Sequence, residues 1–327
     1  MEIRHVLNAK QFDPAWLLND FLPRVSEIKL MLATPQGRAK LRTRLSGMLM
    51  YLFFAEESTR TRFSFATAAI NLGMALVWCE NGKFSSLAKG ESWEETVEVL
   101  LGYLPDILVS RHPSDNAADI AARISDLHHG GIPTINAGSG RKHHPTQSLL
   151  DLFTILELLN RLDNLTIAIG ADVLFSRTAR SLAYLFSKFA SITLRFVTPA
   201  ELAPPSELLE HLTQSGTRFE CTTDVNEGIR GAHVVYWGRL QAERVETAEL
   251  RKQLEAQYAN FQIDVNQVAL MEPNTLLMHP MPISDKHEIT LAVRNGNFPQ
   301  FKVYEQARNG LPVRMALLLH MLENRLN

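Results

Sequence analysis

Short, almost uninterrupted apolar runs alternate with helix-length periodic segments along most of this chain. In the first half, strands are expected at 48–54, 74–79, 106–111 and 133–138, and helices at 62–72, 92–102 and 115–125. Strands that are apolar throughout are buried on both faces, and strands separated by helices pair in parallel. The alternation therefore predicts a parallel sheet that helices cover on both sides.

The second half repeats this rhythm. Strands are expected at Leu165–Ile169, Ile192–Val197, Phe219–Cys221, His233–Trp237 and Thr275–His279. A chain of 327 residues fits about two domains of roughly 150 residues each. We therefore expect an α/β protein with two doubly wound parallel-sheet domains.

Two apolar helical segments organise these domains. One lies within 144–162 and is expected to be a long helix that links the two sheets, and the other, 313–326, could pack back on the first domain. The expected boundaries are 1–143 plus 306–327 for the first domain, 144–162 for the linking helix and 163–305 for the second domain.

Composition excludes several classes of function. The 33 basic and 35 acidic residues give a net charge of −2 without long runs of one sign, so neither a nucleic-acid groove nor a membrane-surface site is expected. The longest apolar stretch, Met48 to Ala55, is far shorter than the roughly 20 residues that cross a bilayer. The start of the chain lacks the apolar core of a signal peptide, so a cytoplasmic location is expected.

Cys79 and Cys221 each lie in an apolar, strand-like segment. Two isolated cysteines of this kind suggest reduced core thiols more than a disulfide, a metal site or a nucleophile.

Ser58-Thr59-Arg60-Thr61-Arg62 stands where an apolar strand gives way to a helix. Free backbone N–H groups, the positive end of the helix and guanidinium groups would meet at this point, which favours a phosphate ligand. The alternative is a helix N-cap beside solvated arginines. The Gly-x-x-x-x-Gly-Lys-Ser/Thr loop of nucleotide triphosphatases is absent from the sequence, which indicates a small anion.

Other chemically active side chains also follow expected strands. The segments concerned are 58–62, 110–113, 138–147, 176–177, 238–244 and 279–282. Because open parallel sheets bind ligands outside the carboxyl ends of their strands, these loops can converge on one cleft between the domains. A dinucleotide site is only weakly indicated, since Gly138-Ser139-Gly140 lacks the third glycine and a downstream acid.

In this order, the segments resemble the aspartate carbamoyltransferases from about residue 40 to residue 320. The carbamoyl phosphate half of the pattern comprises Ser58–Arg62, Ser85–Glu91, Arg111–Pro113, Ile135–Gly138 and His144–Gln147. The aspartate half comprises Ser176–Thr178, Arg239–Arg244 and His279–Pro282, with Gln306 and Arg314 near the end. Ornithine carbamoyltransferases carry a Cys where this chain has Pro280.

The resemblance implies a carbamoyl phosphate site. Its ligands would be Ser58, Thr59, Arg60, Thr61, Ser85, Lys89, Arg111, His144, Gln147, Pro280 and Met281. Arg111 would bridge the phosphate and the carbonyl oxygen, and His144 would donate to that oxygen. Gln147 and the carbonyl groups of Pro280 and Met281 would bind the carbamoyl NH2. Arg60, Thr61, Lys89, Arg111 and His144 would be the catalytic residues.

Some of these positions have plainer alternatives. Arg111 could be a structural ion pair at a strand end, and His144 could be a loop or cap residue. The resemblance also implies a cis bond between Met281 and Pro282.

Ser85 and Lys89 lie in a polar loop. In the family this loop reaches into the adjacent subunit, which implies a homotrimer with shared active sites. The alternative is a solvated surface lysine.

The resemblance also implies that Lys89, Arg177, Arg239 and Gln241 bind aspartate, since guanidinium forks match two carboxylates. Glu56 would pair with Arg177 and Arg244 when the domains close. Because the departing phosphate can accept the amine proton, no cofactor or metal is expected.

The implied activity is a transferase of pyrimidine biosynthesis that makes N-carbamoyl-L-aspartate and phosphate from carbamoyl phosphate and L-aspartate. The alternatives are a carbamoyltransferase for another acidic amine and a non-catalytic paralogue that acts as a scaffold subunit. Regulatory chains or a dihydroorotase remain open as further partners.

Overall fold

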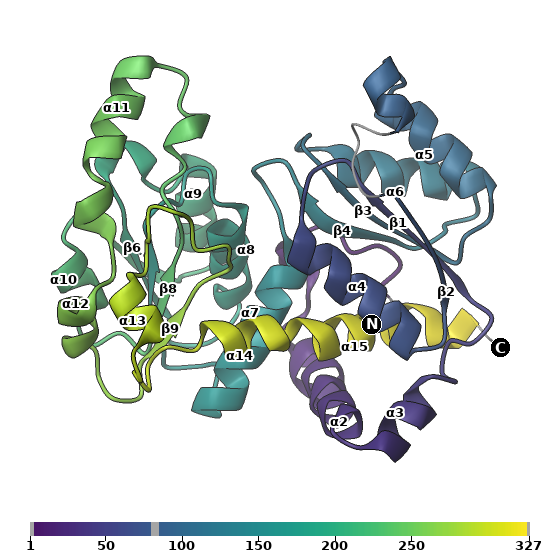
Figure 1. Cartoon of the computed structure of the whole chain (residues 1–327), viewed down its shortest axis with the longest axis horizontal. Helices are drawn as coiled ribbons and strands as arrows, with labels where there is room; N and C mark the ends of the chain where they lie inside the picture. Colours follow the sequence, from purple (N-terminus) through teal and green to yellow (C-terminus); the bar gives the residue numbers. More distant parts are fainter. Residues whose placement is uncertain (1–2, 80–84, 326–327) are drawn as a thin grey trace. The chain divides into compact units, whose positions relative to one another are not determined.

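The computed structural model describes residues 3–79 and 85–325. Its packing divides the chain into two compact units, which are Met1–Phe153 with Asn309–Asn327, and Thr154–Arg308 (Figure 1). Where the sequence predicts a separate linking helix, the chain forms helix α7 (Pro145–Leu159), and the division between the units falls within it.

The sheet of the first unit is parallel throughout, as predicted. Its strands lie side by side in the order β2 (Ala75–Cys79), β1 (Leu49–Phe54), β3 (Ile107–His112) and β4 (Thr134–Ser139). Each strand starts one residue later than the sequence predicts.

The expected helices between these strands are present. They are α4 (Thr59–Asn71), α5 (Trp93–Gly102) and α6 (Ala117–His128), with a short 3-10 turn, η4 (Ser86–Lys89), before α5. The indole Nε1 of Trp93 donates to the carbonyl oxygen of Ala117 at 2.9 Å, so a buried hydrogen bond joins α5 to the start of α6.

No helix is predicted before residue 47, but the structure contains several. They are η1 (Ala9–Gln11), α1 (Pro14–Trp16), the π-helical turn η2 (Leu17–Phe21), α2 (Leu22–Leu32) and α3 (Pro35–Leu41). The side chains of Asp13 and Thr34 cap α1 and α3, and each precedes a proline at the first helical position. This Asx/Thr–Pro pattern is a recognised helix start and could have revealed both helices.

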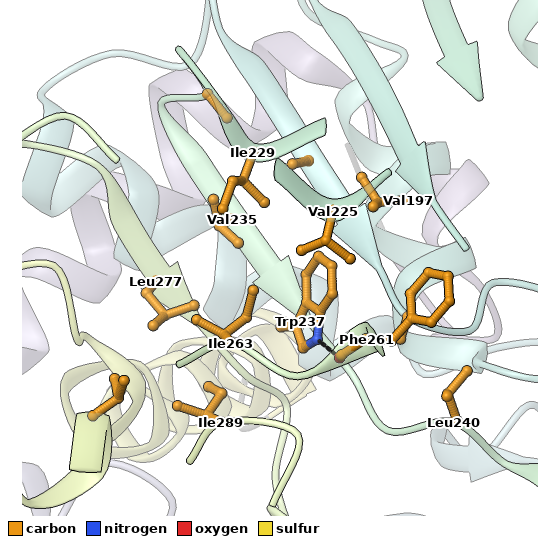
Figure 2. Packing of buried hydrophobic residues seen from close by; sticks show 14 of the residues in the cluster. Val197, Val225, Ile229, Val235, Trp237, Leu240, Phe261, Ile263, Leu277 and Ile289 are labelled. Atoms are coloured by element: carbon orange, nitrogen blue, oxygen red, sulfur yellow. Dashed lines mark hydrogen bonds between the residues drawn. The ribbon is translucent and has the colours of Figure 1, made fainter. Parts of the chain in front are cut away.

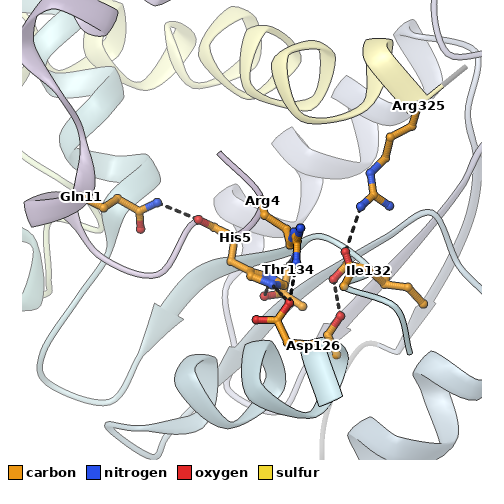
Figure 3. A network of polar contacts seen from close by, with 9 residues as sticks. Arg4, His5, Gln11, Asp126, Ile132, Thr134 and Arg325 are labelled. Carbon is orange, nitrogen blue, oxygen red and sulfur yellow. Dashed lines mark hydrogen bonds and ion pairs between the residues drawn. The ribbon is translucent and has the colours of Figure 1, made fainter. Parts of the chain in front are cut away.

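The start of the chain adds a short parallel bridge to β4. Val6 pairs with Ile135, and the backbone N–H of Val6 donates to the carbonyl oxygen of Thr134 at 2.8 Å. Figure 3 shows the polar contacts around this bridge, in which His5 lies between Thr134 (2.9 Å) and Asp126 (3.1 Å). These contacts tie the amino-terminal segment to the edge of the first sheet.

The closing segment belongs to the first unit. It comprises α15 (Gly310–Leu322) and the short turn η8 (Glu323–Arg325), and α15 packs against α2 and α4. Nearly all side chains of α15 are buried, which explains why this helix is apolar around most of its circumference. The predicted return of the carboxyl-terminal helix to the first domain therefore has a counterpart in the structure.

The second unit has its own parallel sheet, in the order β7 (Arg218–Thr222), β6 (Thr193–Val197), β5 (Thr166–Gly170), β8 (Val234–Trp237) and β9 (Leu276–Met278). Its longer helices are α8 (Arg177–Phe186), α9 (Ser206–Gln214), α11 (Ala248–Ala256) and α14 (Val303–Arg308). Shorter helical segments are η5 (Ala200–Leu202), α10 (Val225–Ile229), η6 (Ala242–Arg244), η7 (Tyr258–Phe261), α12 (Val265–Ala269) and α13 (Leu291–Asn295).

Trp237 organises the core of this unit beside the site described below. Figure 2 shows its indole among buried aliphatic side chains, with Nε1 donating to the carbonyl oxygen of Phe261 at 2.8 Å. A Cβ atom at Gly170 would lie 2.4 Å from the Trp237 ring, so only glycine allows the end of β5 to approach β8 this closely.

The prediction that both cysteines are core thiols is wrong for Cys221. Its residue is exposed, and Cys79 is only partly buried. Both lie in strands at the edge of a sheet, β7 and β2, where one side has no neighbouring strand within the described residues. Neither forms a disulfide.

Within 3–79 and 85–325, the structure has no helix that is both long and apolar enough to cross a membrane.

Candidate active site

In the first sheet, the chain order reverses between β1 and β3. From β1 the chain crosses to β2 on one side, whereas β3 and β4 lie on the other side. The loops that leave the carboxyl ends of β1 and β3 therefore run in opposite directions, and open α/β sheets usually bind ligands at such a point. The loop after β1 carries Glu56 and Ser58, and β3 ends with Arg111 and His112.

Helix α4 begins beside this point. Ser58 is its N-cap residue in extended conformation, but its side chain makes no capping hydrogen bond. The simple N-cap explanation therefore does not account for the Ser58 hydroxyl. Thr61 is buried and Arg60 is exposed at the surface, where desolvation by nearby protein lowers the pKa of its guanidinium.

Arg111 is 8 % exposed and forms an ion pair with Glu56, with 2.5 Å between Nη2 and Oε1. Its Nη1 also donates to the carbonyl oxygen of Ala137 at 3.3 Å. The alternative prediction of a structural ion pair thus describes one state of Arg111. The Glu56 carboxylate, which was expected to meet Arg177 and Arg244, has Arg111 as a partner in this structure.

His112 follows Arg111 and packs against Trp93 in a tilted arrangement, with 4.8 Å between the ring centroids. Its Nδ1 accepts a hydrogen bond from the backbone N–H of Ser114 at 3.0 Å, and burial lowers its pKa. An imidazole that accepts at Nδ1 is neutral, so His112 holds the turn after β3 rather than adding charge.

His144 and Gln147 are both buried, at 4 % and 8 % exposure, at the start of α7. The carbonyl oxygen of His144 accepts from the backbone N–H groups of Gln147 and Ser148, so its backbone opens the helix. The side-chain Nε2 of Gln147 donates to Oδ1 of Asp151 at 2.9 Å. Sequence analysis gave Asp151 no role.

Ser85 and Lys89 lie at either end of the 3-10 turn η4. Gly90 ends this turn with a φ of 96°, a conformation that glycine adopts at low cost. Lys89 is exposed and Ser85 is partly buried. An exposed lysine fits both the predicted intersubunit role and the solvated alternative.

The second sheet also reverses its order, between β5 and β8. Asp172 follows β5 and is fully buried, with Oδ1 accepting from Phe175 N at 2.9 Å. Its Oδ2 accepts from both the backbone N and the side-chain Nε2 of Gln241, each at 3.2 Å. Burial raises the pKa of Asp172 to about 6.

Asp172 is a functional candidate that sequence analysis missed. The sequence signal for Asp172 was an acidic residue in the loop at the carboxyl end of an apolar strand. Its carboxylate fixes the amide of Gln241, a residue predicted to bind aspartate. Asp172 therefore acts through Gln241 and is not itself an aspartate-binding residue.

The predicted arginines of this unit follow the same two strands. Arg177 is the first residue of α8, after Ser176, whose hydroxyl caps the helix by accepting from Ala179 N. Arg239 follows β8 and is partly buried, and the Tyr258 hydroxyl donates to the carbonyl oxygen of Leu240 at 2.7 Å, which anchors this loop. Arg244 ends the short turn η6.

Pro280 and Met281 follow β9, and the Met281–Pro282 bond is cis, as predicted. Nδ1 of His279 accepts from the backbone N–H of Met281 at 2.8 Å. Oε1 of Gln306 accepts from the backbone N–H of His279 at 2.8 Å, so α14 holds the turn in place.

Each unit therefore brings part of the predicted site to the reversal point of its own sheet. The first unit places Glu56, Ser58 and Arg111 there, and the second places Asp172 and Gln241 there with Arg177 and Arg239 close in sequence. In the described residues, no group of three or more His, Cys, Asp and Glu side chains is arranged to hold a metal ion.

Comparisons with known proteins match both units. The family model "Aspartate/ornithine carbamoyltransferase, carbamoyl-P binding domain" matches residues 4–157. The model "Aspartate/ornithine carbamoyltransferase, Asp/Orn binding domain" matches residues 163–321.

Similar sequences include aspartate carbamoyltransferases from distant organisms. The chloroplastic enzyme of Arabidopsis thaliana is 37% identical over 98% of this chain and 78% of its own length. The catalytic subunit from Dichelobacter nodosus is 38% identical over 89% of this chain and 83% of its own length.

Solved structures agree with the sequence matches. Aspartate transcarbamoylase from Trypanosoma cruzi in complex with carbamoyl phosphate is 30% identical, with a TM-score of 0.86 over 98% of this chain and 97% of its own. The catalytic subunit of the M. jannaschii enzyme is 34% identical, with a TM-score of 0.85 over 99% of this chain and 100% of its own. Through both family models and these relatives, the chain belongs to the aspartate/ornithine carbamoyltransferase family.

Proposed function

We propose that this chain is an aspartate carbamoyltransferase, which transfers the carbamoyl group of carbamoyl phosphate to the amine of L-aspartate. The observation that carries the proposal is the buried Arg111 at the reversal point of the first sheet, ion-paired with Glu56 in the loop that leads to α4. Relatives named aspartate carbamoyltransferase support aspartate over another acidic amine. The reaction belongs to pyrimidine biosynthesis.

The phosphate would be bound by Ser58, Thr59, Arg60 and Thr61 at the positive end of α4. Arg111 would bridge the phosphate and the carbonyl oxygen. The Glu56 carboxylate forms an ion pair with Arg111. We infer that bound carbamoyl phosphate replaces this carboxylate, which frees Glu56 for its proposed partners Arg177 and Arg244.

Aspartate would be held through its two carboxylates by Arg177, Arg239, Gln241 and Lys89. Gln241 donates one hydrogen of Nε2 to Asp172, which fixes the amide and leaves the second Nε2 hydrogen as the donor for a substrate carboxylate. A side chain that is already held in place loses less conformational entropy when it binds substrate.

In the reaction, the uncharged amine nitrogen of aspartate attacks the carbamoyl carbon. His144 and Arg111 would stabilise the negative charge that develops on the carbonyl oxygen. The bond from carbon to the bridging phosphate oxygen then breaks, and the departing phosphate accepts the amine proton. Gln147, with the carbonyl groups of Pro280 and Met281, would bind the carbamoyl NH2 and orient the group that moves.

The function can be tested with purified protein and a panel of amines. Phosphate release is measured with carbamoyl phosphate and, separately, aspartate, ornithine and other acidic amines. Among these amines, only aspartate is expected to give rapid phosphate release. Release only with ornithine would overturn the assignment of the second substrate, and no release with any amine would overturn the proposed activity.

We also propose that the active unit is a homotrimer in which Lys89 serves the site of an adjacent chain, and that the enzyme acts in the cytoplasm. The exposed position of Lys89 is compatible with this role. Inactive Lys89→Ala and Arg60→Ala chains, when mixed, should regain part of the activity, because some sites would then receive both intact residues. Recovery of no activity after demonstrated subunit exchange would mean that each chain works alone.

Replacing Glu56 by Gln is expected to affect the two substrates in opposite ways. Inorganic phosphate should bind about 5-fold more tightly, because Arg111 loses a competing anion worth roughly 1 kcal/mol. The KM for aspartate should rise, because closure loses its charge partner. Calorimetry and initial rates measure these effects, with the exposed neighbour Glu57→Gln as control. Unchanged phosphate affinity and unchanged KM would contradict the exchange of partners.

Asp172 predicts a pH dependence of aspartate binding. Its folded-state pKa is raised from 3.8 to about 6, so its contribution to folding stability falls as pH rises through this interval. The Asp172 side chain that fixes Gln241 is fully ionised only above about pH 6. The KM for aspartate should therefore rise as pH falls below 6.

In Asp172→Asn, an NH2 group replaces one carboxylate oxygen. One of the N–H groups that donate to Asp172 then faces another donor. Relative to the wild-type value above pH 6, the KM for aspartate should be about tenfold higher, a change of about 1.4 kcal/mol, and it should show no inflection near pH 6. The exposed Asp163→Asn serves as control. An unaltered inflection in Asp172→Asn would assign the titration to another group.

A further inference from the structure

The orientation of the Gln147 amide decides what this side chain can recognise. An amide has a donor end and an acceptor end, and only the acceptor end can bind the NH2 of a carbamoyl group. Gln147 is 8 % exposed, and its Nε2 is committed to Oδ1 of Asp151 at 2.9 Å. The two residues are one turn apart on α7, so the helix itself keeps them in contact.

An ionised carboxylate accepts hydrogen bonds and cannot donate them. As long as Asp151 is ionised, Gln147 must turn its NH2 towards it. Oε1 of Gln147 is then the end that remains for a ligand. A neutral amide or a protonated acid in place of Asp151 could satisfy either orientation of Gln147.

Arg314 contributes a positive charge close enough to Asp151 for the two charges to interact. Asp151 is fully buried and Arg314 is 3 % exposed, in α15. Burial lowers the pKa of Arg314 to about 10, and the Asp151 carboxylate acts in the opposite direction, so the guanidinium stays protonated at neutral pH. A buried cation and a buried anion in the same core stabilise each other's charged form.

The position of Arg314 is itself fixed. Its Nη1 donates to the carbonyl oxygen of Gly310 at 3.2 Å. Its guanidinium lies over the ring of Phe65, with 5.0 Å between Cζ and the ring centroid. Because Phe65 belongs to α4, Arg314 contacts the helix proposed to bind phosphate and also balances the charge behind Gln147.

We propose that Asp151 is a positioning residue that fixes the Gln147 amide with its oxygen towards the ligand, and so selects a carbamoyl group over an acetyl group. The inference rests on the proposed function, because it takes carbamoyl phosphate to lie against Gln147. Acetyl phosphate is the matched comparison, since it has a methyl group in place of the NH2 and offers no donor to Oε1.

The test compares the two acyl phosphates in wild type and in Asp151→Asn. The KM for carbamoyl phosphate and the inhibition constant of acetyl phosphate as its competitor are measured at fixed aspartate. In Asp151→Asn, discrimination between them should fall about 5- to 10-fold, through weaker carbamoyl phosphate binding, because one oriented hydrogen bond is lost. The inhibition constant of acetyl phosphate should hardly change.

Two further variants separate this role from a structural one. Ser148→Ala is the matched control, because Ser148 is also buried on α7 and its hydroxyl donates to the carbonyl oxygen of Pro145 at 2.8 Å. It should keep the discrimination of the wild type. Gln147→Met should lose discrimination, and adding Asp151→Asn to it should cause no further loss, since Asp151 acts through Gln147.

If Asp151→Asn alone does not fold, Asp151→Asn with Arg314→Met removes both buried charges together and leaves neither uncompensated. This pair should show the same reduced discrimination. A folded Asp151→Asn or double variant with wild-type discrimination would overturn the inference while the proposed function stands. A wild-type chain that releases no phosphate with carbamoyl phosphate and aspartate would overturn the proposed function instead.

Discussion

The reversal of strand order in each sheet is the constraint on which the rest of this structure depends. Where neighbouring parallel strands send their connections in opposite directions, the backbone leaves a gap at their carboxyl ends. β1 and β3 form such a pair in the first unit, and β5 and β8 form one in the second. Side chains from segments that are distant in sequence, such as Glu56 and Arg111, meet there.

A second common feature is that buried carboxylates hold the side-chain amides of two predicted ligands. Gln241 has Asp172, and Gln147 has Asp151. Burying these charges costs free energy, which hydrogen bonds and counter-charges offset. The result is a set of preorganised dipoles, which is the main way in which enzymes stabilise charge that develops during a reaction.

The sequence predicted the sheets well because parallel strands that are buried on both faces form continuous apolar runs. It did not predict that β2 and β7 would be edge strands, and so Cys221 was wrongly placed in the core. The amino-terminal helices were missed because their caps, Asp13 and Thr34, were not recognised.

For the site, too, local sequence patterns could be predicted but three-dimensional contacts could not. A motif can nominate Gln147 or Gln241 as a ligand, but their partners Asp151 and Asp172 depend on how a helix turn and a loop are placed in three dimensions. The pairing of Glu56 with Arg111 depends likewise on β1 and β3 being neighbours. The roles of the ligands in catalysis stay predictions, since they concern bound substrates.

The return of α15 to the first unit also determines the order in which the molecule can be completed during translation. The second unit is continuous, Thr154–Arg308, and leaves the ribosome before α15 does. The apolar faces of α2 and α4 that pack against α15 are synthesised much earlier and lack this cover until α15 emerges. The nascent chain therefore carries an exposed hydrophobic surface until α15 is made, the condition in which chaperones bind and premature association occurs.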